Sequence, residues 1–119
     1  MEQGIRECLS QGGIQVDEVL ERLGGSEALV ERFLKRFLQD TNFQTLCQAM
    51  ESGSMEQALA ASHTLKGMCG NLSMNELTNQ FTQQVAQLRA GDYAAAAQMM
   101  PQIQSDYQRV VQAIQRCWP

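Results

Sequence analysis

The sequence predicts an all-α protein, an antiparallel up-down four-helix bundle with short additional helices near its N-terminus. Leu, Ala, Gln, Glu and Met dominate the composition and favour helices, and almost no strand pattern is present. Proline, which breaks helices, is absent before Pro101. Apolar residues recur at helical spacing along four substantial stretches, and the short connections between these stretches favour antiparallel neighbours.

Length and charge narrow the classes of function. The 119 residues predict a single domain over 1–119, with the core bundle over about 26–117 and enough chain for one hydrophobic core. The net charge of -4 argues against nucleic-acid partners, which require a basic face. No apolar run could span a bilayer and no signal-peptide pattern opens the chain, so we expect a cytoplasmic protein without a membrane partner.

The cysteines and acidic residues give no pattern for a cofactor. Cys8, Cys47, Cys69 and Cys117 form no Cys-x-x-Cys pair, and with one histidine in the chain a zinc site is not expected. We expect free thiols, because no secretion signal is present. There is no Gly-rich phosphate loop for ATP and no acidic cluster for Mg²⁺, so we expect no bound cofactor and no autonomous kinase activity.

Two short helices are expected first, over residues 2–9 and 16–23, each followed by a Gly-Gly pair that ends it. Ser26 is the expected N-cap of the first bundle helix, which should run to about residue 51 with a weaker stretch at 40–42. Ser54 is the next N-cap and has a glutamine three residues later, as in a capping box. The helix that it begins should run to about residue 72.

The last two bundle helices follow after tight turns. Apolar residues at helical spacing predict the third over about 77–90. Asp92 is the expected N-cap of the last helical segment, which continues to about residue 117. Pro101 lies inside this segment and should either kink the helix or begin a new one at its first turn.

The stretch 58–72 contains the only histidine of the chain, His63. As a helix of about 3.6 residues per turn, it places His63 opposite an apolar face. Lys66, Gly67 and Gly70 share the face of His63. The apolar face continues past both glycines, so the helix is expected to pass through them. The apolar face consists of Ala58, Ala61, Leu65, Met68, Cys69 and Leu72.

This combination of residues suits a histidine that carries a phosphoryl group. Each glycine inside a helix costs about 1 kcal/mol relative to alanine, so two beside His63 suggest that a large partner must come close. The Lys66 ammonium can lie next to a group attached to the imidazole, and a neutral imidazole has a ring nitrogen free for nucleophilic attack. The ordinary alternative is a surface histidine followed by glycines that end its helix.

The segment HTLKGMCGNL resembles the signature of histidine-containing phosphotransfer (HPt) domains, the phosphoryl carriers of two-component phosphorelays. Ser73 stands where many members have glycine. Some members place a glutamine on the next helix close to the histidine; Val85 falls at that position, with Gln84 beside it, so no such contact is predicted. Weaker similarity extends from about Gly13 to the C-terminus. The matching residues are His63, Leu65, Lys66, Gly67, Gly70, Asn71 and Leu72.

The resemblance implies the bundle fold, with His63 exposed midway along it as the phosphoacceptor. The chain would accept a phosphoryl group from an aspartyl-phosphate receiver domain, through the Nε2 atom of His63, and pass it to another receiver. Lys66 would offset charge on the phosphoryl oxygens. Receiver domains and a histidine kinase or hybrid kinase would be its partners, Mg²⁺ would be held by the receiver, and the chain would be a carrier rather than an enzyme. The expected docking residues are Gly67, Gly70, Leu59 and Ala60.

Two other classes of function are weighed against this one. A helical protein-interaction module without phosphotransfer would use the same small residues as a docking groove, with His63 incidental. A domain that had lost the activity would often lack the histidine or the lysine, and here both are present. A metal- or cofactor-binding bundle ranks last, because it needs several inward carboxylates or histidines.

Overall fold

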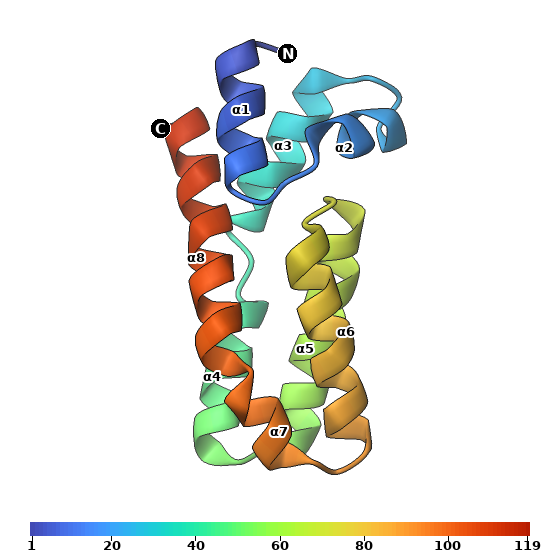
Figure 1. Cartoon of the computed structure of the whole chain (residues 1–119), viewed down its shortest axis with the longest axis vertical. Helices are drawn as coiled ribbons and strands as arrows, with labels where there is room; N and C mark the ends of the chain where they lie inside the picture. The colour runs from blue at the N-terminus through green and yellow to red at the C-terminus, as the bar shows by residue number, and fades with distance from the viewer.

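The computed structural model describes all 119 residues, as helices and connecting turns without strands. Helices α4, α5, α6 and α8 run alternately up and down and form the bundle, while α1, α2 and α3 cover one end and α7 the other (Figure 1). The all-α prediction and the antiparallel bundle with additional N-terminal helices are confirmed. The elements are α1 (Gln3–Gln11), α2 (Val16–Arg22), α3 (Glu27–Phe37), α4 (Asn42–Ser52), α5 (Met55–Asn71), α6 (Asn75–Arg89), α7 (Tyr93–Gln98) and α8 (Met100–Cys117).

Side-chain caps fix where three of the helices begin. Ser26, Ser54 and Asp92 each accept the backbone N–H three residues further on, at 3.2, 3.4 and 3.1 Å. A cap of this kind contributes about 1 kcal/mol to a helix. These are the three N-caps predicted from the sequence. Pro101 lies in the first turn of α8, so of the two alternatives it begins a new helix.

The prediction of one helix from residue 26 to about 51 is wrong. The chain leaves the helical conformation after Phe37 and re-enters it at Asn42. The carboxylate of Asp40 accepts the backbone N–H of Asn42 at 2.9 Å and its side-chain amide at 2.7 Å. Such local bonds give the backbone an alternative to helix, and this one separates α3 from α4.

Packing against α8 stabilises both sides of this break. The ring of Tyr107 stacks on Phe43, at the start of α4, with centroids 4.0 Å apart. It also lies 5.5 Å from the ring of Phe37, the last residue of α3. One aromatic side chain of α8 therefore contacts both ends of the break.

Helix α5 lies between α4 and α6 and contributes a row of small and medium side chains to the core. Ala58, Ala61, Leu65 and Cys69 are buried as predicted, and Met68 is half-buried. Burial, with a smaller contribution from the charge of Asp40, raises the pKa of the Cys69 thiol from 9.0 to about 12. Cys69 therefore behaves as a small apolar group, and all four cysteines are free thiols.

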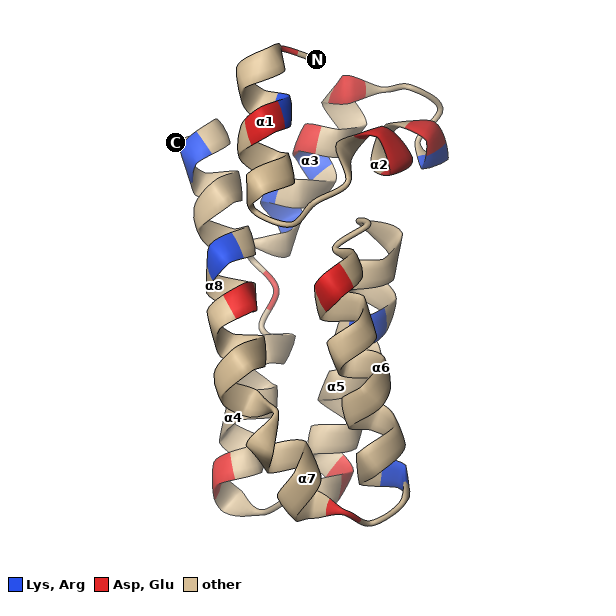
Figure 2. Cartoon of the chain, in the orientation of Figure 1, with Lys and Arg blue, Asp and Glu red and all other residues tan.

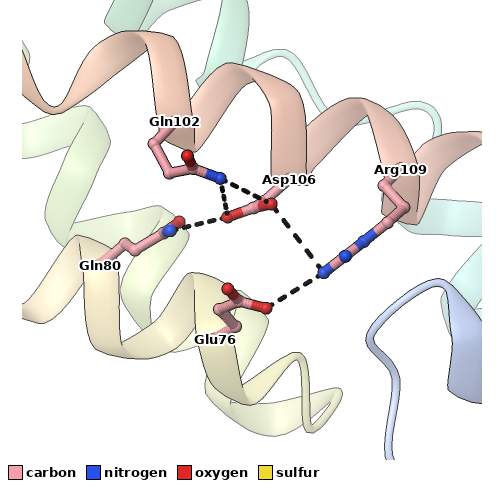
Figure 3. A network of polar contacts seen from close by, with 5 residues as sticks. All are labelled: Glu76, Gln80, Gln102, Asp106 and Arg109. Carbon is pink, nitrogen blue, oxygen red and sulfur yellow. Dashed lines mark hydrogen bonds and ion pairs between the residues drawn. The ribbon is translucent and has the colours of Figure 1, made fainter.

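A polar network joins α6 to α8 (Figure 3). Asp106 on α8 is only 5% exposed and accepts hydrogen bonds from Gln80 at 2.7 Å and Gln102 at 3.2 Å. Arg109 forms an ion pair with Glu76 of α6 at 3.0 Å and lies 3.9 Å from Asp106. The buried carboxylate of Asp106 faces two amide donors and Arg109, so the network fixes α6 against α8 without leaving this charge unpaired, while the Oε1 of Gln80 is buried without a hydrogen bond.

Helix α1 packs against the C-terminal half of α8. A Cβ atom on Gly12 would lie 2.3 Å from the Cβ of Ala113, so only glycine permits this close approach. The Cys8 thiol donates to the carbonyl of Ala113 at 3.6 Å and the Cys117 thiol to that of Ile5 at 3.9 Å. None of the eight helices combines the length and apolar composition needed to cross a membrane.

Candidate functional site

The candidate phosphoacceptor helix α5 is continuous from Met55–Asn71. It therefore passes through both Gly67 and Gly70, as predicted, and neither glycine ends it. His63 lies in the middle of this helix with its side chain exposed. The structure thus places the imidazole on the open side of a helix that is held along its opposite side by the core.

His63 and Lys66 have no partners within the chain. Lys66 is half-exposed and belongs to none of the ion pairs. Neither side chain takes part in a hydrogen bond. Because residues three apart are neighbours on a helix surface, the ammonium of Lys66 can reach a group carried by the ring of His63.

Neither glycine beside His63 is required by the packing of the fold. A Cβ atom on Gly67 would have no other atom within 4 Å. A Cβ atom on Gly70 would lie 3.7 Å from the Cγ2 of Thr78, an ordinary contact. Glycine has a low helix propensity, and crowding within the chain does not explain its presence at these two positions. The approach of an external surface would explain it.

The two other predicted docking residues differ in how much surface they offer. Ala60 is exposed, and its carbonyl accepts a hydrogen bond from the hydroxyl of Thr64 at 3.0 Å. Leu59 is half-buried and packs against the core. On a helix of about 100° per residue, both lie within roughly 60° of His63. The small residues Ala60 and Gly67 lie on one side of the histidine, and Lys66 lies on the other.

Two residues next to the site have a structural role that the sequence did not predict. Ser62 is fully buried, and its hydroxyl donates to Oε1 of Gln84 on α6 at 2.8 Å. Gln84 is fully buried as well, and its amide donates to the carbonyl of Ala96 at 3.1 Å. Gln84 could have been found from its spacing with Phe81 and Leu88, which places a polar residue in an otherwise apolar core row.

Ser73, where many HPt domains have glycine, adopts a backbone conformation that favours glycine. Its φ is 50°, in the left-handed region. Its hydroxyl accepts a hydrogen bond from Arg22 at 3.0 Å, and its carbonyl accepts the N–H of Gln15 at 3.0 Å. Arg22 also donates to the carbonyl of Asn71 at 2.6 Å. These bonds tie the turn between α5 and α6 to α2 and offset the strain at Ser73.

A groove of about 650 Å³ opens beside the C-terminal end of α5, between it, α3 and the end of α2. Its floor is mainly apolar, and it carries two arginines. Lys, Arg, Asp and Glu are dense on α1 to α3 and sparse along the middle of the bundle (Figure 2). No group of three or more His, Cys, Asp and Glu side chains could hold a metal ion. The groove residues are Arg22, Leu23, Phe33, Arg36, Phe37, Gln39, Asp40, Met68, Asn71 and Leu72.

A family model, that of the Hpt domain, matches residues 28–113. This is more than half of the chain, so the chain belongs to the Hpt domain family. Members of this family are phosphotransfer carriers of two-component phosphorelays; they interact with receiver domains and kinases and are not themselves enzymes. No curated protein and no solved structure matches the chain.

Proposed function

We propose that the chain accepts a phosphoryl group on His63 from the aspartyl phosphate of one receiver domain and passes it to the aspartate of another. The observation that carries this proposal is the open face of α5. It presents an exposed imidazole and a neighbouring ammonium that have no partner in the fold, beside glycines that the packing does not require.

The transfer is a balanced exchange of one bond to phosphorus for another. The Nε2 lone pair of neutral His63 attacks phosphorus in line, while the proton on Nδ1 stays in place. As the N–P bond forms, the bond from phosphorus to the aspartyl oxygen breaks, and the carboxylate leaves with the electron pair. In the second transfer, a carboxylate oxygen attacks phosphorus and His63 leaves as the neutral imidazole.

Lys66 is proposed to stabilise the charge on the phosphoryl oxygens during both transfers. Its ammonium is not held by any carboxylate of the chain, so it can turn to the phosphoryl group without breaking an ion pair. We place the Mg²⁺ of the reaction on the receiver domain, beside its aspartate.

The receiver is proposed to dock over the small residues on the His63 face, which let its surface approach the helix backbone. Gly67, Gly70 and Ala60 would provide this approach, and Leu59 would provide a partly buried apolar contact. A histidine kinase or hybrid kinase would supply the first phosphorylated receiver. Since these partners act in the cytoplasm, we place the carrier there.

The test is phosphorylation of the intact chain by a small phosphoramidate donor and by phosphorylated receiver domains, followed by intact mass and peptide mapping. We expect one acid-labile phosphoryl adduct, on His63, and its loss in His63→Gln. The variant should keep the helical circular dichroism and melting temperature of the parent, because an exposed side chain contributes little to stability. If His63→Gln still took up phosphate, the assignment of the acceptor would fail.

The same experiment separates the proposal from the interaction-module alternative. A chain that binds receiver domains but accepts phosphate from none of them, nor from the small donor, would be an interaction module. Transfer from a phosphorylated receiver to His63 and onward to a second receiver is the outcome that the proposal requires.

A further inference from the structure

The buried amide of Gln84 is unusual for its position in α6. The neighbouring core positions of this helix are apolar, as in Phe81 and Leu88. Burying an amide is unfavourable unless its groups are hydrogen-bonded, and here they are. Oε1 accepts from the Ser62 hydroxyl at 2.8 Å, and Nε2 donates to the Ala96 carbonyl at 3.1 Å and lies 3.2 Å from the Met100 sulfur.

These bonds connect α5 to the far end of the bundle. Ser62 belongs to α5, Gln84 to α6, Ala96 to α7, and Met100 is the first residue of α8. One side chain therefore sets the position of the middle of α5 relative to three other helices. The residue that it holds, Ser62, directly precedes His63.

Near His63, hydrogen bonds fix the rotation of α5 about its axis more than side-chain packing does. N-terminal to His63 the fully buried side chains of the helix are small, those of Ala58, Ala61 and Ser62, and the first large one is Leu65, two residues beyond the histidine. Small side chains interlock weakly with neighbouring helices, so they resist a rotation of α5 about its axis less than large ones would. The bond from Ser62 to Gln84 is directional, and a rotation that broke it would turn His63 through the same angle.

We propose that Gln84 is a positioning residue for phosphotransfer, which through Ser62 fixes the rotation of α5 and hence the direction in which His63 meets the receiver. This inference rests on the proposed function. Gln84 does not touch the phosphoryl group. It acts on the orientation of the nucleophile, and an error of about 1 Å in such an orientation can cost as much as about 100-fold in rate.

A double variant separates positioning from stability. Gln84→Leu or Ser62→Ala alone removes one partner of a buried hydrogen bond and should lower the melting temperature by several degrees. Together they remove both partners, and the Ala96 carbonyl still accepts the N–H of Met99 at 3.3 Å. The double variant should therefore recover most of the melting temperature, because no buried polar group is left unpaired.

The experiment measures single-turnover transfer from a phosphorylated receiver at increasing receiver concentration, for the parent, both single variants and the double variant. We expect the double variant to melt within about 2 °C of the parent but to keep a maximal transfer rate about tenfold or more lower. The half-saturating receiver concentration should change little, since the docking residues are untouched. Val30→Ala is the matched control, because it removes buried packing in α3 without touching this hydrogen-bond chain.

A parent-like transfer rate in the double variant would overturn the proposal, as would rates that follow melting temperature across all variants including Val30→Ala. If the double variant does not fold, Gln84→Met provides the test, since it keeps the length of the side chain without its amide. A parent-like rate in Gln84→Met would then overturn the proposal, and a slower maximal rate would support it. Failure of the proposed function itself is distinct, because the parent chain would then take up no phosphate on His63.

Discussion

The two faces of helix α5 are built in opposite ways. The buried face contains only apolar groups and a serine whose hydroxyl is hydrogen-bonded. On the open face, an imidazole and an ammonium have no partner, Gly67 leaves the backbone exposed, and Gly70 is half-buried. The buried face stabilises the fold, whereas the open face contributes little to it. The buried residues are Ala58, Ala61, Ser62, Leu65 and Cys69, and the open ones are His63, Lys66, Gly67 and Gly70.

Of the nine Lys and Arg side chains in the chain, three form ion pairs with carboxylates, and Lys66 is among the six that do not. Lys35 pairs with Glu31 one turn earlier in α3, at 2.9 Å. Arg109 pairs with Glu76 across two helices, at 3.0 Å. Lys66 has no such partner although it lies on a central bundle helix. The comparison of the two faces teaches that stability and phosphotransfer should be separable by face, with Ser62 as the proposed exception, and substitutions on α5 can test this.

The largest effect is expected on the buried face. Leu65 is fully buried, so Leu65→Ala should lower the free energy of unfolding by about 2–5 kcal/mol through lost packing and a residual cavity. Urea unfolding measures this change. At a temperature where the variant is folded, its transfer rate should stay close to that of the parent; a large loss of rate in the folded variant would contradict the separation of the two faces.

A substitution on the open face should lower the phosphoryl-transfer rate and leave the free energy of unfolding nearly unchanged. Lys66→Ala should slow phosphoryl transfer about 10- to 100-fold, equivalent to about 1.4–2.7 kcal/mol, because one charge on the phosphoryl oxygens is no longer offset. Its free energy of unfolding should change by less than about 0.5 kcal/mol, since Lys66 has no partner to lose. Single-turnover transfer and urea unfolding give the two quantities. Lys35→Ala is the control, and an equal loss of rate there would point to a general charge effect.

The buried face should also respond to alkaline pH. The pKa of Cys69 rises from 9.0 to about 12 in the folded chain, so between these values the folded state keeps a proton that the unfolded state releases. This contribution to stability is present below pH 9.0 and is lost as pH rises toward 12. The slope approaches about 1.4 kcal/mol per pH unit. Urea unfolding just below pH 9.0 and one unit above it should show a smaller fall in Cys69→Ala than in the parent; equal falls would exclude this role of Cys69.

The smallest effect is expected at Gly67, where a larger residue should raise stability and weaken receiver binding. Gly67→Ala adds a methyl group into open space and should stabilise the chain by about 0.5–1 kcal/mol through helix propensity. The same methyl group should raise the half-saturating receiver concentration, and Gly67→Leu should raise it further. Gln112→Leu, at an exposed position of α8, is the control for added bulk. Unchanged receiver affinity in Gly67→Leu would remove the steric explanation for the glycines.

The sequence predicted the features that depend on neighbours within one or two turns. The N-cap of α5 at Ser54, its passage through both glycines and the outward direction of His63 all follow from spacing and caps. The roles given to His63 and Lys66 stay predictions, as does the extent of the domain beyond the matched residues 28–113.

Features that depend on contacts between distant elements were not predictable in this way. The break after α3 needs Tyr107 of α8 as well as the local bonds of Asp40. The contact between Ser62 and Gln84 depends on how two helices face each other. Adjacent side chains on a helix point about 100° apart, so a count along α6 that is off by one residue selects Val85 in place of Gln84.

The contact of α1 with α8 has a consequence for the order of folding. The bond from the Cys8 thiol to the Ala113 carbonyl joins residues 105 positions apart, whereas only short turns separate α4 from α5 and α5 from α6. Closing the long loop costs more chain entropy than closing the turns, so the local hairpins of helices should form first. The helix that carries His63 would then be in place before α1 docks, and a transient opening of α1 would leave the open face around His63 intact.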